Sequence, residues 1–222
     1  MANAKTLKSR LASGEFDARL KEVYLSDKAV EDQKKRDAVI IDEFVRLFGD
    51  NDSIELFSAP GRTEVGGNHT DHNHGKVLAA SVDLDTVAAA AKRDDGIIVE
   101  KSFKFDALEV DISDLEVHTE EFGKSSGLIR GMCAGFKERG YNIGGFNAAS
   151  MSRVLSGSGL SSSAAYEVLI GTILNHLYND GKVSPVEVAK IAQYAENKYF
   201  GKPCGLLDQT ASAVGSFITI DF

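Results

Sequence analysis

The stretch from Ser156 to Glu167, which reads SGSGLSSSAAYE, has the residue types and spacing of a phosphate-binding loop. Glycine alternates with small residues, three serines follow, and the apolar run VLIGTILNHLY then predicts a buried helix. The N-terminus of a helix leaves backbone N–H groups unpaired and carries about half a positive charge, so an anion there meets donors that already point at it. We therefore predict an anion site in which Gly157 and Gly159 let a bulky ligand approach the backbone.

The same stretch matches neither of two common nucleotide motifs. It lacks the lysine of the Walker pattern GxxxxGK[ST], and Ser162 stands where the last glycine of GxGxxG would be. On these residues alone, an ordinary serine-capped helix after a glycine-rich turn is the competing interpretation.

A second polar group, NHTDHNH, runs from Asn68 to His74. It holds three of the five histidines in the chain and follows Arg62 closely. Three interpretations compete. A polyhydroxylated ligand would be met by alternating donors and acceptors, with Arg62 serving an anion. A metal would be held by His69, Asp71, His72 and His74, although without the i, i+4 spacing of HExxH. A solvated polar turn is the third interpretation.

Two carboxylates complete the candidate chemistry. Asp208 follows a loop with glycine at 201 and 205, and it is either a general base or a helix N-cap. Glu196 lies on the polar face of a predicted helix, where it is either a metal ligand or a solvated residue.

Composition narrows the class of protein. The chain has 222 residues, a net charge of -8 and a pI near 5.2, which argues against nucleic acid or an anionic membrane as the main partner. No segment has about 18 continuous apolar residues, and the N-terminus lacks the apolar core of a signal peptide, so we expect a cytoplasmic protein. Cys133 and Cys204 are expected to be free thiols.

The elements that position these groups follow from periodicity and turn signals. We predict helices within residues 5–49, a helical extension over residues 1–50 and a second unit over residues 51–222. Residues 54–112 are predicted to be rich in strands, with KVLAASVDL and DTVAAAAKR as two short ones. Further predictions are helices over residues 127–139, 162–178 and 185–199, the last after a capping box at Ser184, and strands over residues 146–155 and at the C-terminal GSFITIDF.

The order of four motifs resembles that of the galactokinases in the GHMP kinase superfamily. These are APGR, the GGNHTDHN loop, the GLSSSA loop before a helix, and KPCGLLDQ, and the resemblance runs from about Phe57 to Phe222. It implies an α+β fold like domain 2 of ribosomal protein S5, with a mixed sheet and helices packed on one face. Members of the family continue into a C-terminal domain with further sugar-pocket residues, so we expect this chain alone to be inactive or nearly so.

The resemblance implies an ATP- and Mg²⁺-dependent transfer of phosphate to galactose, giving galactose 1-phosphate. By this resemblance, six residues hold the nucleotide: Gly157, Gly159, Leu160, Ser161, Ser162 and Ser163. A hydroxyl of Ser162 or Ser163 and the carboxylate of Glu196 would bind Mg²⁺. The implied partners are the sugar, ATP and the protein's own C-terminal domain.

The resemblance also implies the residues that act on the sugar. Asp208 matches the catalytic base, and Arg62 matches the arginine that neutralises charge on the transferred group. Asn68, His69, Asp71 and Gly205 match positions of the sugar pocket. At three positions the chain departs from the family: Asn68 replaces a glutamate, His72 a tyrosine and Glu64 an asparagine.

Three alternatives stay open at this point. The protein is a weakly active sugar and nucleotide sensor, a kinase for another hexose or an amino sugar, or a metal-dependent hydrolase that uses the histidine cluster.

Overall fold

One mixed β-sheet organises the fold. The structure, a computed structural model, describes residues 2–68 and 70–222. Its strands have the order β1-β2-β5-β3-β4, and β6 pairs with β2 outside this path. β3 and β5 are parallel, and the other pairs are antiparallel. The strands are Glu55–Gly66 (β1), Lys76–Lys92 (β2), Ile97–Ser102 (β3), Leu108–Asp111 (β4), Phe146–Ser152 (β5) and Phe217–Asp221 (β6). The predicted α+β fold with a mixed sheet is confirmed.

The strand β2 is the longest of the sheet, and the prediction of two short strands in its place was wrong. β1 pairs with almost the whole of it, from Glu55 opposite Ala90 to Gly66 opposite Leu78. On its other side β2 pairs with β6 over residues 76–80 and with β5 over residues 86–92. Alanine has a low intrinsic preference for strands, and here pairing with strands on both sides gives β2 the stability that its side chains do not.

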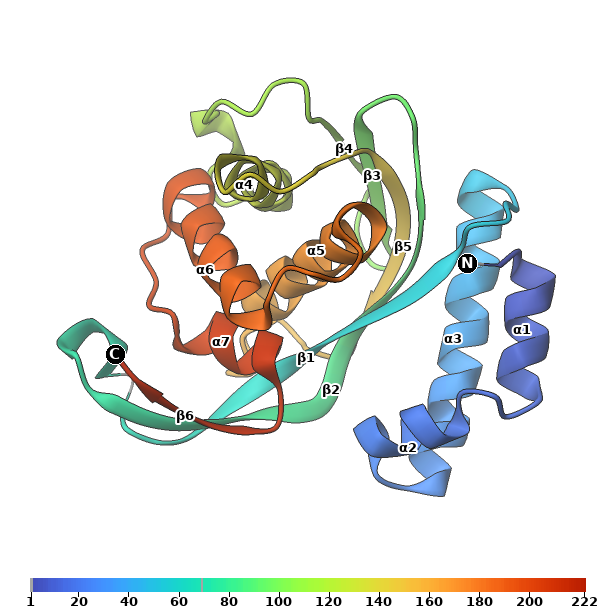
Figure 1. Ribbon diagram of the computed structural model, residues 1–222, viewed down its shortest axis with the longest axis horizontal. Helices are drawn as coiled ribbons and strands as arrows, with labels where there is room; N and C mark the ends of the chain where they lie inside the picture. Colours follow the sequence, from blue (N-terminus) through green and yellow to red (C-terminus); the bar gives the residue numbers. More distant parts are fainter. Residues whose placement is uncertain (1, 69) are drawn as a thin grey trace.

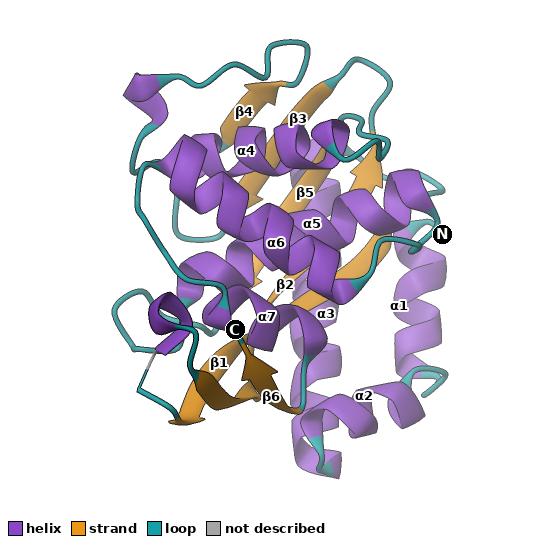
Figure 2. Ribbon diagram, turned by 60° about the vertical axis from the view of Figure 1, so that its left-hand side comes forward, coloured by secondary structure: helices purple, strands orange, loops and turns teal. Residues whose placement is uncertain are grey.

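Four helices cover one face of the sheet, as predicted. They are α4 (Ser125–Glu138), α5 (Ser162–Asn179), α6 (Pro185–Ala195) and α7 (Leu207–Val214). Figure 2 shows α4, α5 and α6 lying in front of the strands. The core beneath them combines small strand residues such as Ala88 and Ala148 with large helix residues such as Phe136 and Ile173. Small residues on the strands let the helices approach closely.

Three further helices pack on the opposite face and form a layer that the family resemblance did not predict. They are α1 (Ala4–Ala12), α2 (Asp17–Tyr24) and α3 (Asp27–Phe48), and Figure 1 shows them on the far side of the sheet from α5 and α6. Ile40, Ile41 and Phe44 of α3 are fully buried against Val87 and Ala89 of β2. The predicted helical pattern of residues 5–49 is confirmed, and Gly49 ends it at a φ of 79°.

Two details near the C-terminal end affect the site. α6 continues into a π-helical turn, Glu196–Phe200. A helix, α7, does start near Asp208, as the N-cap interpretation requires, but its N-cap is Leu206 and Asp208 lies in its first turn, so Asp208 as the N-cap was wrong. Both cysteines are free thiols, as expected. None of the helices in the described ranges has the length and apolar character needed to span a membrane.

Candidate active site

Arg62 and Asp208 form an ion pair that joins β1 to α7. Arg62 Nε donates to Asp208 Oδ1 at 2.6 Å. Arg62 lies just past an irregularity in the pairing of β1 with β2, and Asp208 lies in the first turn of α7. The Arg62 side chain is buried, whereas the Asp208 side chain is 30% exposed, so the carboxylate is open to a ligand from one side. The second carboxylate oxygen accepts a hydrogen bond from Ser161 Oγ.

The same arginine holds the glycine-rich loop. Its Nη1 donates to the carbonyl of Gly159 at 2.6 Å, and its backbone N–H donates to the carbonyl of Leu160 at 3.1 Å. The preceding residue, Gly61, must lack a side chain, because a Cβ there would lie 2.9 Å from the Leu160 carbonyl oxygen. Arg62 therefore fixes the loop and the carboxylate of Asp208 in one arrangement.

The loop has the conformation that its glycines predict. Gly157 and Gly159 have φ values of 76° and 78°, and open space surrounds both. Ser161 is also left-handed, at a φ of 56°, which costs a residue with a side chain about 1–2 kcal/mol. α5 begins at Ser162, and the Ser161 side chain makes no capping bond to it. The interpretation as an ordinary serine-capped helix is therefore wrong, and the Ser161 hydroxyl contacts Asp208 instead.

Glu196 is buried in the site and is not a solvated helix residue. It is 2% exposed. One carboxylate oxygen accepts from Ser163 Oγ at 3.2 Å and from Lys202 Nζ at 3.3 Å. The other accepts from Gln209 Nε2 at 2.8 Å. Gln209 follows Asp208 directly, so the first turn of α7 carries one carboxylate of the site and binds the other.

A third carboxylate, Glu167, lies beside Glu196 and was missed at the level of sequence. Glu167 is fully buried on α5, one turn after Ser163, and its Oε2 lies 3.4 Å from Gln209 Nε2. Its Oε1 has no hydrogen-bond partner among the described residues. Burial first, and then the negative charge of Glu196, raise the pKa of Glu167 well above its usual value. A glutamate inside an apolar helical run was the only signal in the sequence.

The oxygen atoms of Ser163 and Glu196 fit a magnesium ion. They are hard donors 3.2 Å apart, and Mg²⁺ is commonly bound by one or two protein groups with phosphate and water completing its shell. Among the described residues no group of three or more His, Cys, Asp or Glu side chains is arranged to hold a metal. His69 lies outside the described residues, as do the side chains of Asp71 and His72, so the histidine-cluster hypothesis stays untested.

The predicted sugar pocket is described only in part. Asn68 adopts a left-handed conformation at a φ of 54°, and Asp71 lies in the 3-10 turn η1 (Thr70–Asn73). Gly205 lies in the loop before α7, three positions ahead of Asp208. The approach of these residues to a sugar stays a prediction.

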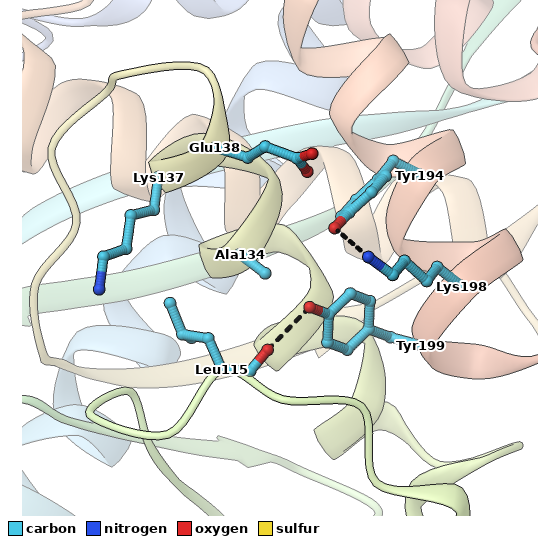
Figure 3. Close-up of a pocket in the computed structure, with 7 residues that line it drawn as sticks. All are labelled: Leu115, Ala134, Lys137, Glu138, Tyr194, Lys198 and Tyr199. Atoms are coloured by element: carbon cyan, nitrogen blue, oxygen red, sulfur yellow. Dashed lines mark hydrogen bonds between the residues drawn. The ribbon is translucent and has the colours of Figure 1, made fainter.

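A separate surface pocket lies away from these residues, between α4 and the end of α6 (Figure 3). Its volume is about 290 Å³, and none of the predicted site residues lines it. Tyr199 donates to the carbonyl of Leu115 at 2.8 Å, and Lys198 donates to the hydroxyl of Tyr194 at 3.1 Å. The first bond connects two walls of the pocket, and the second lies within the segment formed by α6 and the turn that follows it.

Two sequence signatures match the chain. The galactokinase galactose-binding signature matches residues 42–92, and the GHMP kinases N terminal domain matches residues 127–216. The first covers Arg62 and the polar loop, and the second covers the glycine-rich loop, Glu196 and Asp208.

Curated relatives agree with the signatures. The galactokinase of Clostridium tetani is 34% identical over 173 residues, which are 78% of this chain and 44% of that protein. The galactokinase of Clostridium beijerinckii is 37% identical over 179 residues, which are 80% of this chain and 46% of that protein. This chain thus spans about half the length of the curated relatives it matches.

Solved structures give the same result. The crystal structure of Lactococcus lactis galactokinase complexed with galactose matches with a TM-score of 0.76 and 34% identity, over 83% of this chain and 48% of that one. The Methanococcus jannaschii mevalonate kinase matches with a TM-score of 0.63 and 16% identity, over 76% of this chain and 54% of that one, a likeness of fold alone.

Proposed function

We propose, from the premise that this chain belongs to the GHMP kinase family and matches the N-terminal part of its galactokinases, that it carries half of a sugar kinase site. The reaction is transfer of the γ-phosphate of ATP to the anomeric hydroxyl of galactose. The observation that carries the proposal is the contact of Asp208 with Arg62 and Ser161, which joins a carboxylate to the glycine-rich loop. The galactose bound in the Lactococcus lactis structure supports galactose as the sugar, and the kinase names of the relatives support ATP as the phosphate donor.

Asp208 is the group best placed to accept a proton. In the proposed step it takes the proton of the anomeric hydroxyl while that oxygen bonds to the γ-phosphorus and the bond to the ADP oxygen breaks. Arg62 lies between Asp208 and the loop carbonyl of Gly159, so its charge faces both the base and the region where phosphate would lie. Phosphoryl transfer depends mainly on positioning and electrostatics, and this arrangement provides both.

The loop and the start of α5 would hold the nucleotide. The open backbone at Gly157 and Gly159 leaves room for the β and γ phosphates, and the N-terminus of α5 offers unpaired N–H groups. When bound, Mg²⁺ would neutralise charge on these phosphates, held by Glu196 with Ser163 or Ser162.

Asn68, His69, Asp71 and Gly205 are proposed to contact the sugar. Asn68 is the position to examine first, because an amide brings no charge where the family has a glutamate. A hydrogen-bonding pocket rejects a misplaced hydroxyl strongly, since the rejected sugar leaves buried groups unpaired. ATP and free sugar are both cytosolic metabolites, which supports a cytoplasmic location.

A hexose panel tests the proposal. The whole protein that carries this sequence is assayed for ADP release with ATP and a set of hexoses and amino sugars. We expect galactose to give the largest kcat/KM and the Asn68→Glu variant to shift the order of preference. If none of the sugars is turned over although ATP and galactose bind normally, the protein is instead a sensor. Stoichiometric zinc and hydrolysis without ATP would indicate the hydrolase.

A further inference from the structure

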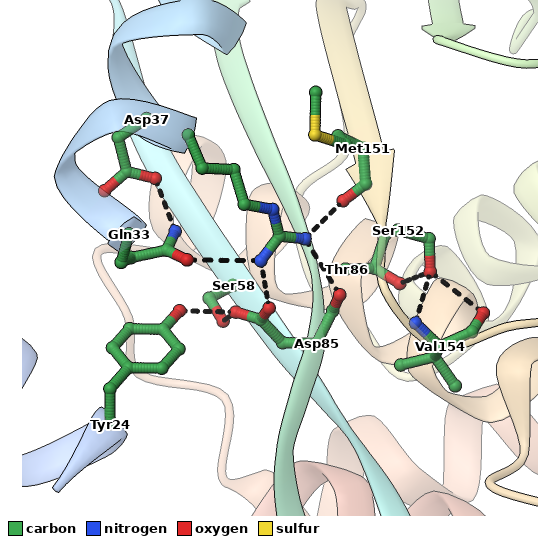
Figure 4. A network of polar contacts seen from close by, with 10 residues as sticks. Tyr24, Gln33, Asp37, Ser58, Asp85, Thr86, Met151, Ser152 and Val154 are labelled. Atoms are coloured by element: carbon green, nitrogen blue, oxygen red, sulfur yellow. Dashed lines mark hydrogen bonds and ion pairs between the residues drawn. The ribbon is translucent and has the colours of Figure 1, made fainter. Parts of the chain in front are cut away.

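Besides the apolar contacts of α3 with β2, the N-terminal helices contact the sheet through a polar network that centres on Asp85 of β2 (Figure 4). Asp85 is 2% exposed. One of its carboxylate oxygens accepts from Tyr24 of α2 and Ser58 of β1, each at 2.5 Å, and the other accepts from Arg36 of α3. Residues 2–41 precede both matched signatures, so the helical residues of this network, Tyr24, Gln33, Arg36 and Asp37, lie outside them.

Arg36 does more than neutralise Asp85. Its Nη2 donates to the carbonyl of Asp85 at 2.9 Å and to the carbonyl of Met151 at 2.8 Å. These two carbonyls belong to adjacent strands, β2 and β5, at the point where their pairing ends with Thr86 opposite Ser152. A guanidinium can hold two carbonyls and a carboxylate together because its donors lie in one rigid plane.

The end of this strand pair is also the start of the glycine-rich loop. The Asp85 carbonyl accepts a second hydrogen bond, from the backbone N–H of Arg153 at 2.8 Å. Next to it, Ser152 Oγ pairs with Thr86 Oγ1 at 2.7 Å and accepts from the N–H of Val154 at 3.1 Å. Contacts therefore run without a break from Arg36 to Arg153 and Val154, the residues that lead into the loop.

Val154 also contacts the active site directly, at the residue before Arg62. A Cβ on Gly61 would lie 3.2 Å from the methyl groups of Val154, so Val154 packs directly against the residue before Arg62. A shift of Val154 would move both the entrance of the loop and the backbone of Arg62. A glycine-rich loop gains most from such support, because it has many conformations to lose on binding a ligand.

We propose that Arg36 is a positioning residue for the phosphate loop of residues 156–163, and that the N-terminal helices serve to hold Arg36 against the end of the strand pair. The proposal rests on the proposed function only for the identity of the loop's ligand. The conformational order of the loop is independent of that function, because it can be measured without any nucleotide.

Residue-resolved hydrogen exchange of the whole protein, without nucleotide, tests the proposal. The reporters are the N–H groups of Arg153 and Val154, which are hydrogen-bonded at the loop entrance. In the Arg36→Lys variant the positive charge remains, but an ammonium cannot hold both carbonyls and the carboxylate. We expect exchange at the two reporters to become about tenfold faster, the effect of losing one hydrogen bond to a charged group.

Two controls separate positioning from general stability. Tyr24→Phe removes a hydrogen bond to the same Asp85 carboxylate and leaves both carbonyls held, so reporter exchange should stay within about twofold of wild type. Arg46→Lys changes the same residue type on the exposed side of α3, where Arg46 pairs with Glu43. The proposal is overturned if Tyr24→Phe, at an equal loss of Tm, accelerates the reporters as much as Arg36→Lys does, or if Arg36→Lys leaves them unchanged.

Should Arg36→Lys fail to fold, Arg36→Gln takes its place with the same expected result, because one amide donor group cannot hold both carbonyls and the carboxylate. Ser152→Ala then separates the two reporters. It removes the acceptor of the Val154 N–H but leaves the Arg153 bond in place, so we expect faster exchange at Val154 and unchanged exchange at Arg153. Equal effects at the two reporters, or none, would contradict the chain of contacts.

Kinetics supply the link to function. In Arg36→Lys we expect the KM for ATP to rise about tenfold, in line with the exchange, while the KM for galactose stays within twofold. If the wild type binds no ATP, the proposed function fails while the exchange result still decides the role of Arg36. If the wild type is active and the exchange is unchanged in Arg36→Lys, only the further inference fails.

Discussion

Arg62 Nε and Asp208 Oδ1 lie 2.6 Å apart although 146 positions separate the two residues in the chain. The contact joins β1 to the first turn of α7 and brings the general-base candidate to the glycine-rich loop. Because Arg62 also binds the Gly159 carbonyl, the base and the loop cannot move independently.

The first prediction concerns Asp208→Asn in the whole protein. The amide keeps the shape of the side chain but cannot accept the proton of the sugar hydroxyl, so kcat should fall by about 10²–10⁴-fold with little change in ATP affinity. Steady-state kinetics and calorimetric binding of ATP measure the two effects. Asp221→Asn is the matched control, because Asp221 pairs with Lys76 at the exposed end of β6. Near-normal turnover in Asp208→Asn would remove the base assignment.

The second prediction concerns Arg62→Lys. A lysine can reach either Asp208 or the Gly159 carbonyl but cannot hold both in the fork geometry of arginine. We expect kcat to fall and the KM for ATP to rise, each by at least about tenfold, because one charge-assisted bond to each partner is at stake. Arg19→Lys at the surface, where Arg19 pairs with Glu22, is the control. A variant that changes only kcat would show that the loop does not depend on Arg62.

Local patterns in the sequence were enough to locate Arg62, Asp208 and the glycine-rich loop, and the observed contacts bring all three together. Glu167 was missed for a physical reason. Glu167 becomes buried only when α6 and α7 pack over α5, and the residue pattern within α5 does not predict that packing. The network of Arg36 and Asp85 was missed likewise, since it joins helices α2 and α3 to three strands that the sequence could not place beside them.

Two departures from the predicted secondary structure, the start of α7 and the unbroken β2, also have tertiary causes. The segment Leu207–Val214 contains Asp, Thr, Ser and Val, which are weak helix formers, and α7 is stabilised by the burial of Leu207 and Ala211 against the sheet. The alanine-rich β2 is stabilised by its neighbours on both sides. His69 lies outside the described residues, so the sugar pocket remains a prediction from the motif.

The third prediction concerns the proposed magnesium ligands. Glu196→Gln removes the buried charge beside Ser163, and we expect at least about tenfold more Mg²⁺ for half-maximal activity. Ser163→Ala should act in the same direction with a smaller effect, because it removes a neutral ligand. Calorimetric titration of the protein with Mg·ATP gives a readout apart from turnover. Glu187→Gln on α6, the helix that precedes the turn of Glu196, is the control: Glu187 pairs with Arg139, and the variant should leave the Mg²⁺ requirement unchanged.

The last prediction concerns the pH dependence of stability through Asp37 of α3. Burial, the largest cause, raises the pKa of Asp37 to about 7 from the usual 3.8, and the charge of Asp85 adds to the rise. Hydrogen bonding from Gln33 and the charges of Arg36 and Arg153 act in the opposite direction. Between pH 4 and 7 the folded state therefore binds more protons at this position than the unfolded state does.

It follows that the contribution of Asp37 to the free energy of unfolding falls as the pH rises from about 4 to 7 and is constant above that range. A shift of about three pKa units corresponds to at most about 4 kcal/mol. Asp37→Asn can still accept the 2.6 Å hydrogen bond from Gln33 and carries no charge to bury. We expect this variant to be more stable than wild type at pH 8 and similar to it at pH 4.5, in urea unfolding at both pH values.

Asp32→Asn, on the exposed side of the same helix, should show no such dependence on pH. A stability difference for Asp37→Asn that is equal at both pH values would mean that Asp37 titrates in the folded protein as it does in the unfolded chain.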